Sequence, residues 1–138
     1  MSRALNDLHP FVRTKAERLV ALAKGEGITL LVTATLRTIE EQDALYAQGR
    51  AGRPGKIVTN ARGGETPHNY GLAFDVVPVD GHGEPEWQAP QPVWLAVYRA
   101  AEKAGLDALG DKWGEYVSWD PGHFQEPGWR VLVEGKVV

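Results

Sequence analysis

Two runs of apolar, largely β-branched residues constrain the fold of this chain more than any other feature. Residues 28–35 (ITLLVTAT) are almost continuously apolar, which is typical of a strand covered on both faces, and we expect this strand to be central. Residues 72–79 (LAFDVVPV) predict a second buried strand, interrupted by one acid, Asp75. A buried carboxylate needs a partner, so Asp75 is the first candidate for a functional side chain.

Three segments carry helical patterns. Apolar residues recur at three- and four-residue steps over 10–24, with Pro10 in the first turn. The sequence T-I-E-E at 38–41 is a capping box, which opens a second helix that ends before Gly49. Residues 93–104 predict a third helix.

Strands and helices do not alternate in a βαβ rhythm. The stretches 49–67 and 80–92 are Gly- and Pro-rich loops, and a loop as long as the first usually has a function. After residue 105, short apolar pieces stand between Gly and Pro, which we interpret as strands and turns. A length of 138 residues is near the modal domain size. We therefore predict a single α+β domain over 1–138, with a small, largely antiparallel sheet flanked by helices.

The composition excludes several classes of partner. With 15 basic and 18 acidic residues, the chain has no cationic excess to neutralise phosphates, so we expect no nucleic-acid partner. There is no apolar run of about 18 residues, so we expect no membrane insertion. The first residues lack an apolar region of signal-peptide length, which predicts synthesis in the cytoplasm. Because cysteine is absent, any metal must be held by histidine and carboxylate.

Two of the four histidines suit metal binding. His68 ends the long loop, Asp75 follows seven residues later, and Gly71 between them permits a sharp reversal. His123 lies far along the chain. Two histidines and one carboxylate leave a fourth tetrahedral position open, which is the composition of a catalytic zinc site. On spacing alone, His68 and Asp75 also suit a solvated loop, and His123 also suits a cluster with the aromatic residues Trp119, Phe124 and Trp129.

Two further side chains suit hydrolysis of an anionic peptide. Asp120 stands three residues before His123 across a Pro-Gly turn, where its carboxylate can lie beside a metal and act as a general base. Arg37 lies in a strand-to-helix turn and has the forked donors that grip a carboxylate. An ordinary turn at Asp120 and a structural ion pair at Arg37 are the open alternatives.

The other histidines and several tryptophans are interpreted structurally. We assign His82 to solvent and His9 to the entry of the first helix. Three tryptophans suit the core or a groove wall, namely Trp87, Trp94 and Trp113.

Four ordered motifs run from the first helix to about residue 124. They are Leu36-Arg37 with Glu41-Gln42 through Tyr46 and Gly49-Arg50, then Val58-Thr59, then T-x-H-x-x-G-x-A-x-D over 66–75, and D-x-x-H over 120–123. In these motifs the chain resembles the LAS-type, or VanY-like, zinc peptidases. Among them it is most similar to the phage endolysins that are L-alanyl-D-glutamate endopeptidases.

The resemblance implies a role for each matching residue. It implies that one zinc ion per chain is bound by His68, Asp75 and His123. It also implies that Asp120 is the catalytic acid and that Arg37 binds the substrate carboxylate. Gln42 is implied to support the same pocket, and Thr66 keeps the hydroxyl of the serine that the family usually has there. Residues 108–113 (ALGDKW) depart from the Trp-Gly-Gly segment of relatives, so the wall of the cleft is expected to differ.

The resemblance also implies a function. We expect a monomeric zinc endopeptidase that cuts the L-Ala–D-Glu bond of peptidoglycan stem peptides, as an endolysin released through a holin-type pore. A D-Ala-D-Ala carboxypeptidase or dipeptidase is the alternative with the same chemistry. A metal-stabilised wall-binding module without turnover is the alternative from another class, although Asp120 would then have no use. No separate wall-binding domain is expected.

Overall fold

The computed structural model describes residues 1–112, 115–116 and 120–134 of the 138-residue chain. The centre of the molecule is a four-stranded antiparallel sheet with the strand order β1-β2-β6-β3. These strands are β1 (Leu30–Ala34), β2 (Ala73–Pro78), β3 (Asp107–Ala108) and β6 (His123–Gln125). The prediction of a single α+β domain with a small antiparallel sheet is confirmed.

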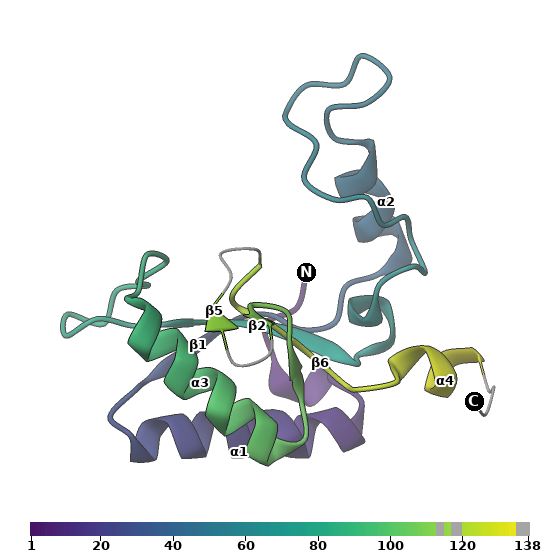
Figure 1. Cartoon of the computed structure of the whole chain (residues 1–138). Coiled ribbons are helices and arrows are strands. Elements are labelled where there is room, and N and C mark those ends of the chain that lie inside the picture. The colour runs from purple at the N-terminus through teal and green to yellow at the C-terminus, as the bar shows by residue number, and fades with distance from the viewer. Residues whose placement is uncertain (113–114, 117–119, 135–138) are drawn as a thin grey trace.

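Two helices, α1 (Pro10–Gly25) and α3 (Gln91–Ala104), lie side by side on one face of the sheet (Figure 1). Both match the segments predicted to be helical. Their apolar stripes and the facing side of the sheet enclose the core, whose largest fully buried apolar side chains include Trp94, Phe74, Phe124 and Leu19. The prediction that Trp94 belongs to the core is confirmed.

The register between β2 and β6 sorts their side chains onto two faces. Phe74 lies opposite Phe124, and Asp75 lies opposite His123. Successive residues of a strand point to opposite faces. Phe74 and Phe124 stack in the core with their ring centroids 5.8 Å apart. Asp75 and His123 therefore lie together on the face that α1 and α3 do not cover.

The prediction that residues 28–35 form a central strand covered on both faces is wrong. β1 is at the edge of the sheet and, among the described strands, pairs only with β2. The helices α1 and α3 cover one face only, so Leu31 on β1 is 39% exposed. The β-branched residues of this run favour an extended strand whether or not its second face is buried.

Two short helical segments frame the region above the sheet. The helix α2 (Ile39–Ala47) begins with the predicted capping box, because Thr38 Oγ1 accepts from the Glu41 amide and Glu41 Oε1 accepts from the Thr38 amide, both at 3.0 Å. The 3₁₀ helix η2 (Pro67–Tyr70) follows the long loop. A similar 3₁₀ turn, η1 (Leu5–Asp7), precedes α1.

The segment after residue 105 contains the predicted short strands and one helix that was not predicted. Besides β3 and β6, it holds a two-stranded sheet of β4 (Asp111–Lys112) and β5 (Glu115–Tyr116). The helix α4 (Trp129–Glu134) replaces the expected strand or turn. Its valines favour a strand locally, but Trp129 is buried and stacks on Tyr70 with a centroid distance of 6.3 Å. Tertiary packing thus sets the conformation of this segment.

Several minor predictions can be checked against the structure. His9 caps α1, since its Nδ1 accepts from the Phe11 amide at 3.2 Å, and His82 is exposed, both as predicted. Trp87 is 59% exposed, so its assignment to a core or groove wall is wrong, and Trp113 lies outside the described residues. In the described part of the chain, no helix has the length and apolar character needed to cross a bilayer.

A buried ion pair fastens α1 to the end of β6. Lys15 Nζ lies 2.8 and 2.7 Å from the two carboxylate oxygens of Glu126 and also donates to the Gly105 carbonyl. Replacing Lys15 with methionine leaves the Glu126 carboxylate buried without its cation. We expect the free energy of unfolding to fall by about 3 kcal/mol, the low end for breaking a buried pair because Lys15 is partly exposed.

Urea denaturation measures this loss. The double variant Lys15→Met with Glu126→Leu removes both charges and should recover most of the stability. A loss below about 1 kcal/mol in Lys15→Met, the size expected of an exposed pair, would contradict the prediction.

Candidate active site

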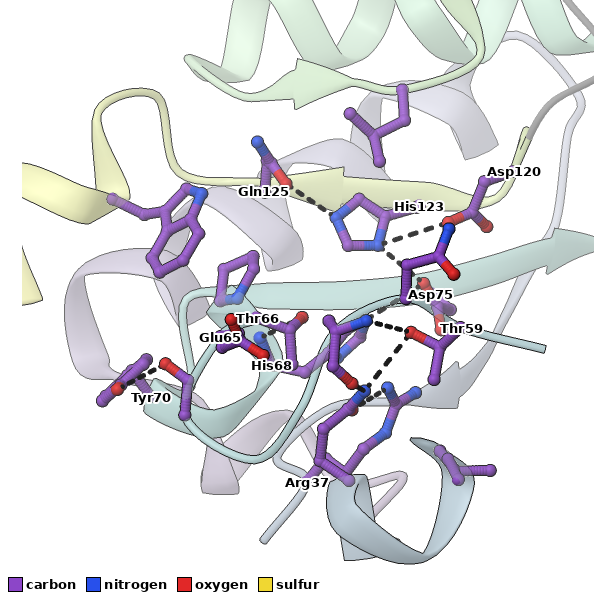
Figure 2. A pocket seen from close by; sticks show the side chains of 18 of the residues that line it. Arg37, Thr59, Glu65, Thr66, His68, Tyr70, Asp75, Asp120, His123 and Gln125 are labelled. Atoms are coloured by element: carbon purple, nitrogen blue, oxygen red, sulfur yellow. Dashed lines mark hydrogen bonds and ion pairs between the residues drawn. The ribbon is translucent and has the colours of Figure 1, made fainter. Parts of the chain in front are cut away.

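Three side chains that the sequence predicts as metal ligands converge on the open face of the sheet (Figure 2). Asp75 Oδ1 on β2 lies 3.4 Å from His123 Nδ1 on β6 and 3.4 Å from His68 Nε2 on η2. One ligand atom from each residue lies within 4.8 Å of the other two. Both histidines are buried. The predicted grouping of two histidines and one carboxylate is therefore present in the fold.

A tight turn brings His68 to β2. Gly71 ends η2 in the left-handed conformation with φ 68°, and its amide lies near the His68 carbonyl. A Cβ at this position would stand 2.8 Å from the His9 amide nitrogen, so glycine is required. Thr66 caps the start of η2, because its Oγ1 accepts from the His68 amide at 3.4 Å. The threonine hydroxyl thus orients the segment that carries His68.

Hydrogen bonds on the outer side of the cluster fix both imidazole rings. His68 Nδ1 lies 2.9 Å from the Thr35 carbonyl, which can only accept, so Nδ1 carries the proton and Nε2 presents a lone pair to Asp75. His123 Nε2 lies 2.8 Å from Gln125 Oε1, which leaves His123 Nδ1 facing the cluster. This is how metal-ligating histidines are usually oriented.

The centre of the cluster lacks an internal hydrogen bond. Asp75 Oδ1 is buried and has no hydrogen-bond partner among the described residues, although two imidazole nitrogens face it. A divalent cation bound by all three side chains would satisfy this oxygen and both lone pairs. The residues present therefore fit a metal ion, and nitrogen and oxygen donors of this kind suit zinc.

The charges of the cluster reinforce one another. Burial would raise the pKa of Asp75, but the imidazoles of His123 and His68, in their protonated and positively charged form, hold it well below its usual range. Burial would lower the pKa of His123, but the Asp75 carboxylate outweighs it and raises that pKa. The cluster therefore has a fixed negative charge at Asp75 that attracts a cation.

Asp120 lies beside the cluster without joining it. Its Oδ2 is 3.8 Å from His123 Nδ1, and its side chain is half-exposed. Withdrawal from solvent, followed by the nearby Asp75 carboxylate, raises the pKa of Asp120 against the opposing effect of His123. Asp75 and Asp120 therefore differ in environment, which is the pattern expected of a ligand and a proton carrier.

The turn that carries Asp120 is tightly held. Asp120 has φ 47°, and the Tyr98 hydroxyl on α3 donates to the Pro121 carbonyl at 2.9 Å. A Cβ on Gly122 would lie 2.3 Å from the Val76 carbonyl oxygen, so the backbone of the turn packs directly against β2. Sequence reasoning found the turn but missed the role of Tyr98, because the contact joins residues far apart in the chain.

Arg37 reaches the same pocket from the segment between β1 and α2. Its Nη1 donates to Gln42 Oε1 at 2.7 Å, while its buried Nε has no hydrogen-bond partner among the described residues. Gln42 in turn donates from Nε2 to the Ala61 carbonyl at 2.7 Å. Gln42 therefore positions Arg37, and the guanidinium keeps an unused donor.

These groups open on one pocket of about 1260 Å³, which exceeds the roughly 300–1,000 Å³ of typical small-molecule sites. Its lining includes all seven predicted site residues, namely Arg37, Gln42, Thr66, His68, Asp75, Asp120 and His123. Of the divergent segment 108–113, Leu109 lines the pocket, while Trp113 lies outside the described residues. The size suits an extended peptide.

Sequence reasoning missed other groups around the pocket. Gln125 is two residues after His123 on β6 and hence on the same face, which is a signal that the strand period could have supplied. Thr35 acts through its backbone carbonyl, so its side-chain type carried no signal. Trp129 lines the pocket from the helix that was not predicted.

Comparison with known proteins agrees with this geometry. Residues 5–125 match the VanY family, which is described as D-alanyl-D-alanine carboxypeptidase. The chain belongs to the VanY family. Within it, the chain is 42% identical to the peptidoglycan L-alanyl-D-glutamate endopeptidase CwlK of Bacillus subtilis, in an alignment that covers 77% of this chain and 67% of CwlK.

Solved VanY-like structures share the fold. The L-Ala D-Glu endopeptidase ChiX of Serratia marcescens superposes with a TM-score of 0.57 at 22% identity, over 89% of this chain and 83% of ChiX. The vancomycin resistance D,D-pentapeptidase VanY, solved in complex with Zn(II), superposes with a TM-score of 0.60 at 21% identity, over 92% of this chain and 76% of that one. At these identities the likeness is one of fold.

Proposed function

We propose that this VanY-family protein is a zinc-dependent endopeptidase that hydrolyses the L-Ala–D-Glu bond of peptidoglycan stem peptides. The observation that carries the proposal is the His68, Asp75 and His123 cluster with the non-ligand acid Asp120 beside it in one pocket. The 42% identity to CwlK, an enzyme named for this bond, supports the choice of substrate. The Zn(II) complex of the related VanY structure supports the choice of metal.

The three ligand residues would hold one zinc ion, which would supply Lewis-acid polarisation of the scissile carbonyl and acidify a water molecule. Asp120 then accepts the proton of the attacking water and returns it to the leaving amine. The raised pKa of Asp120 suits both transfers, because a more basic carboxylate accepts the proton of the attacking water more readily and carries it to the leaving amine. Thr35 and Gln125 keep both imidazoles in the ligating tautomer.

Arg37 selects the substrate in this proposal. The D-Glu residue on the leaving side of the bond has a free α-carboxylate, and a guanidinium binds a carboxylate through two parallel hydrogen bonds. Gln42 already holds Nη1 of Arg37 at 2.7 Å, which orients the fork before substrate arrives. Arg37 and the cluster line the same pocket, so carboxylate and scissile carbonyl can be bound together.

Digestion of purified peptidoglycan, with identification of the new termini by mass spectrometry, tests the proposed function. Cleavage between L-Ala and D-Glu is the expected result. Release of terminal D-Ala instead would identify a carboxypeptidase, the activity for which the family is described. Binding without any new terminus would identify a non-catalytic module.

The endolysin role is a further part of this proposal. Expression in a peptidoglycan-containing host should lyse the cells only when a holin-type pore is produced together with the protein. Lysis without the pore would contradict this route of release.

Replacing Arg37 with lysine should remove the preference for a free α-carboxylate, because an ammonium cannot form the two parallel bonds. The measurement is kcat/KM for a stem peptide with a free D-Glu α-carboxylate and for its α-amide. Wild type should favour the free acid by about 1.5–3 kcal/mol, the range for a hydrogen bond to a charged group. The variant should cleave both at similar, low rates. Equal cleavage of the two peptides by wild type would make Arg37 structural.

A further inference from the structure

The helix α2 and the loop that follows it stand away from the sheet, on the side opposite to α1 and α3 (Figure 1). We call residues 39–65 the α2 lobe. One edge of the lobe borders the candidate active site, because residues 57–61 line the pocket. The function proposed above uses Gln42 of the α2 lobe and leaves its outer part unexplained.

Hydrogen bonds fix the loop of the α2 lobe to its helix. Gln42 is 1% exposed and bonds the Ala61 carbonyl, as described above. Arg50 Nη2 donates to the Thr59 carbonyl at 3.0 Å. Cation–π contacts also hold the loop, since the Arg50 and Arg62 guanidiniums lie 3.9 and 5.1 Å from the centroid of the Tyr46 ring. The α2 lobe is thus held at the edge of the pocket.

The outer part of the α2 lobe concentrates positive charge. Residues 48–62, which we call the basic tip, contain four cationic side chains and no acidic one. The whole chain has 18 acidic and 15 basic residues, so this excess is local. The acids of the α2 lobe lie outside the tip, namely Glu40, Glu41, Asp43 and Glu65.

Two of the four cations differ from Arg50 and Arg62 in their side-chain contacts. Arg53 and Lys56 are exposed, and within the described ranges neither side chain forms an ion pair or hydrogen bond. The next residues, Ile57 and Val58, are each 57% exposed and line the pocket. Exposed apolar side chains bordered by free cations are a common feature of binding surfaces.

We propose that the basic tip binds the peptidoglycan that surrounds the stem peptide being cut. This inference rests on the proposed function. Peptidoglycan repeats its stem peptides along the glycan strand, and their free carboxylates make it a polyanion. Arg53 and Lys56 would pair with carboxylates of neighbouring stem peptides, while the pocket holds the peptide to be cleaved. Such complementarity raises the local concentration and the association rate of a charged partner.

The test compares an insoluble and a small substrate. The substrates are sacculi stripped of accessory polymers, the same sacculi before stripping, and a short soluble stem peptide that can fill only the pocket. The variant is Arg53→Gln with Lys56→Gln. The matched control is Arg18→Gln with Lys24→Gln, which removes two exposed cations from α1 on the far side of the sheet. Cosedimentation with sacculi measures binding independently of cleavage.

We expect the tip variant to bind and digest sacculi about tenfold less well than wild type at low ionic strength. It should cleave the soluble peptide at a rate within twofold of wild type, and the control should match wild type on both substrates. At about 1 M salt, where the Debye length is about 3 Å, wild type should fall to the level of the tip variant.

Three results would overturn the proposal. The first is that the tip variant binds sacculi as well as wild type does at low salt. The second is that the tip variant loses as much activity on the soluble peptide as on sacculi. The third is that the tip variant loses binding and activity only on sacculi that retain accessory polymers. The last would identify those polymers as the partner. If wild type cleaves neither substrate, the proposed function fails, and cosedimentation still decides whether the basic tip binds peptidoglycan.

Discussion

Asp120→Asn should lower kcat on a stem peptide by about a hundredfold or more while leaving zinc content and fold intact. The amide has nearly the same shape as the carboxylate but cannot accept a proton from the attacking water. The backbone should tolerate the change, because Asp120 has φ 47° and asparagine adopts this left-handed conformation readily. The loss should therefore report proton transfer rather than a disturbed turn. Steady-state kinetics, with metal analysis of the same sample, provide the measurement.

The control for this substitution is Asp107→Asn, which makes the same chemical change on β3 outside the main pocket. It should keep the wild-type rate. Activity of Asp120→Asn within a few-fold of wild type would remove Asp120 from the mechanism. A parallel loss of zinc would instead make Asp120 a contributor to the metal site, despite its distance of 3.8 Å from the nearest histidine nitrogen.

The sequence predicted the site better than the sheet around it. His68, Gly71 and Asp75 lie close together in the chain, so a reversal at one glycine suffices to bring both ligands to one face. His123 comes from a distant strand. It was grouped with the other two because a third nitrogen or oxygen ligand completes a catalytic zinc set, and the resemblance to the VanY-like peptidases supported that grouping. The register that places it opposite Asp75 depends on non-local pairing, which spacing cannot reveal.

The errors have a common cause. Residues 28–35 were predicted to be central because their composition suits double burial, yet the position of a strand in a sheet depends on which strands pair with it. The helix α4 was missed because Trp129 packs against Tyr70, a contact across more than fifty residues. Local patterns such as the capping box at Thr38 were predicted correctly, since the atoms that form them are near in sequence.

The hydrogen-bond partners of the two ligating histidines show the same difference between local and non-local contacts. Gln125 lies on the same strand face as His123, so its position could be predicted from the two-residue period of a strand. The contact with the Thr35 carbonyl depends on the fold and could not be predicted in this way. Both partners act on the tautomer of an imidazole. The metal site therefore depends on β2, β6, η2 and the residue that follows β1 together.

His123→Ala and His68→Ala should each abolish stoichiometric zinc binding, because either change leaves only two of the three ligands. Protein purified without chelator should contain about one zinc per chain, and each variant should lose most of it by elemental analysis. Gln125→Leu should keep the ligands but weaken zinc affinity by about 10–100-fold, since His123 Nε2 loses its acceptor at 2.8 Å. The exposed His82, changed to alanine, is the matched control and should retain zinc. Full zinc occupancy in both ligand variants would place the metal elsewhere, and the buried Asp75 oxygen between two imidazoles would then need another partner.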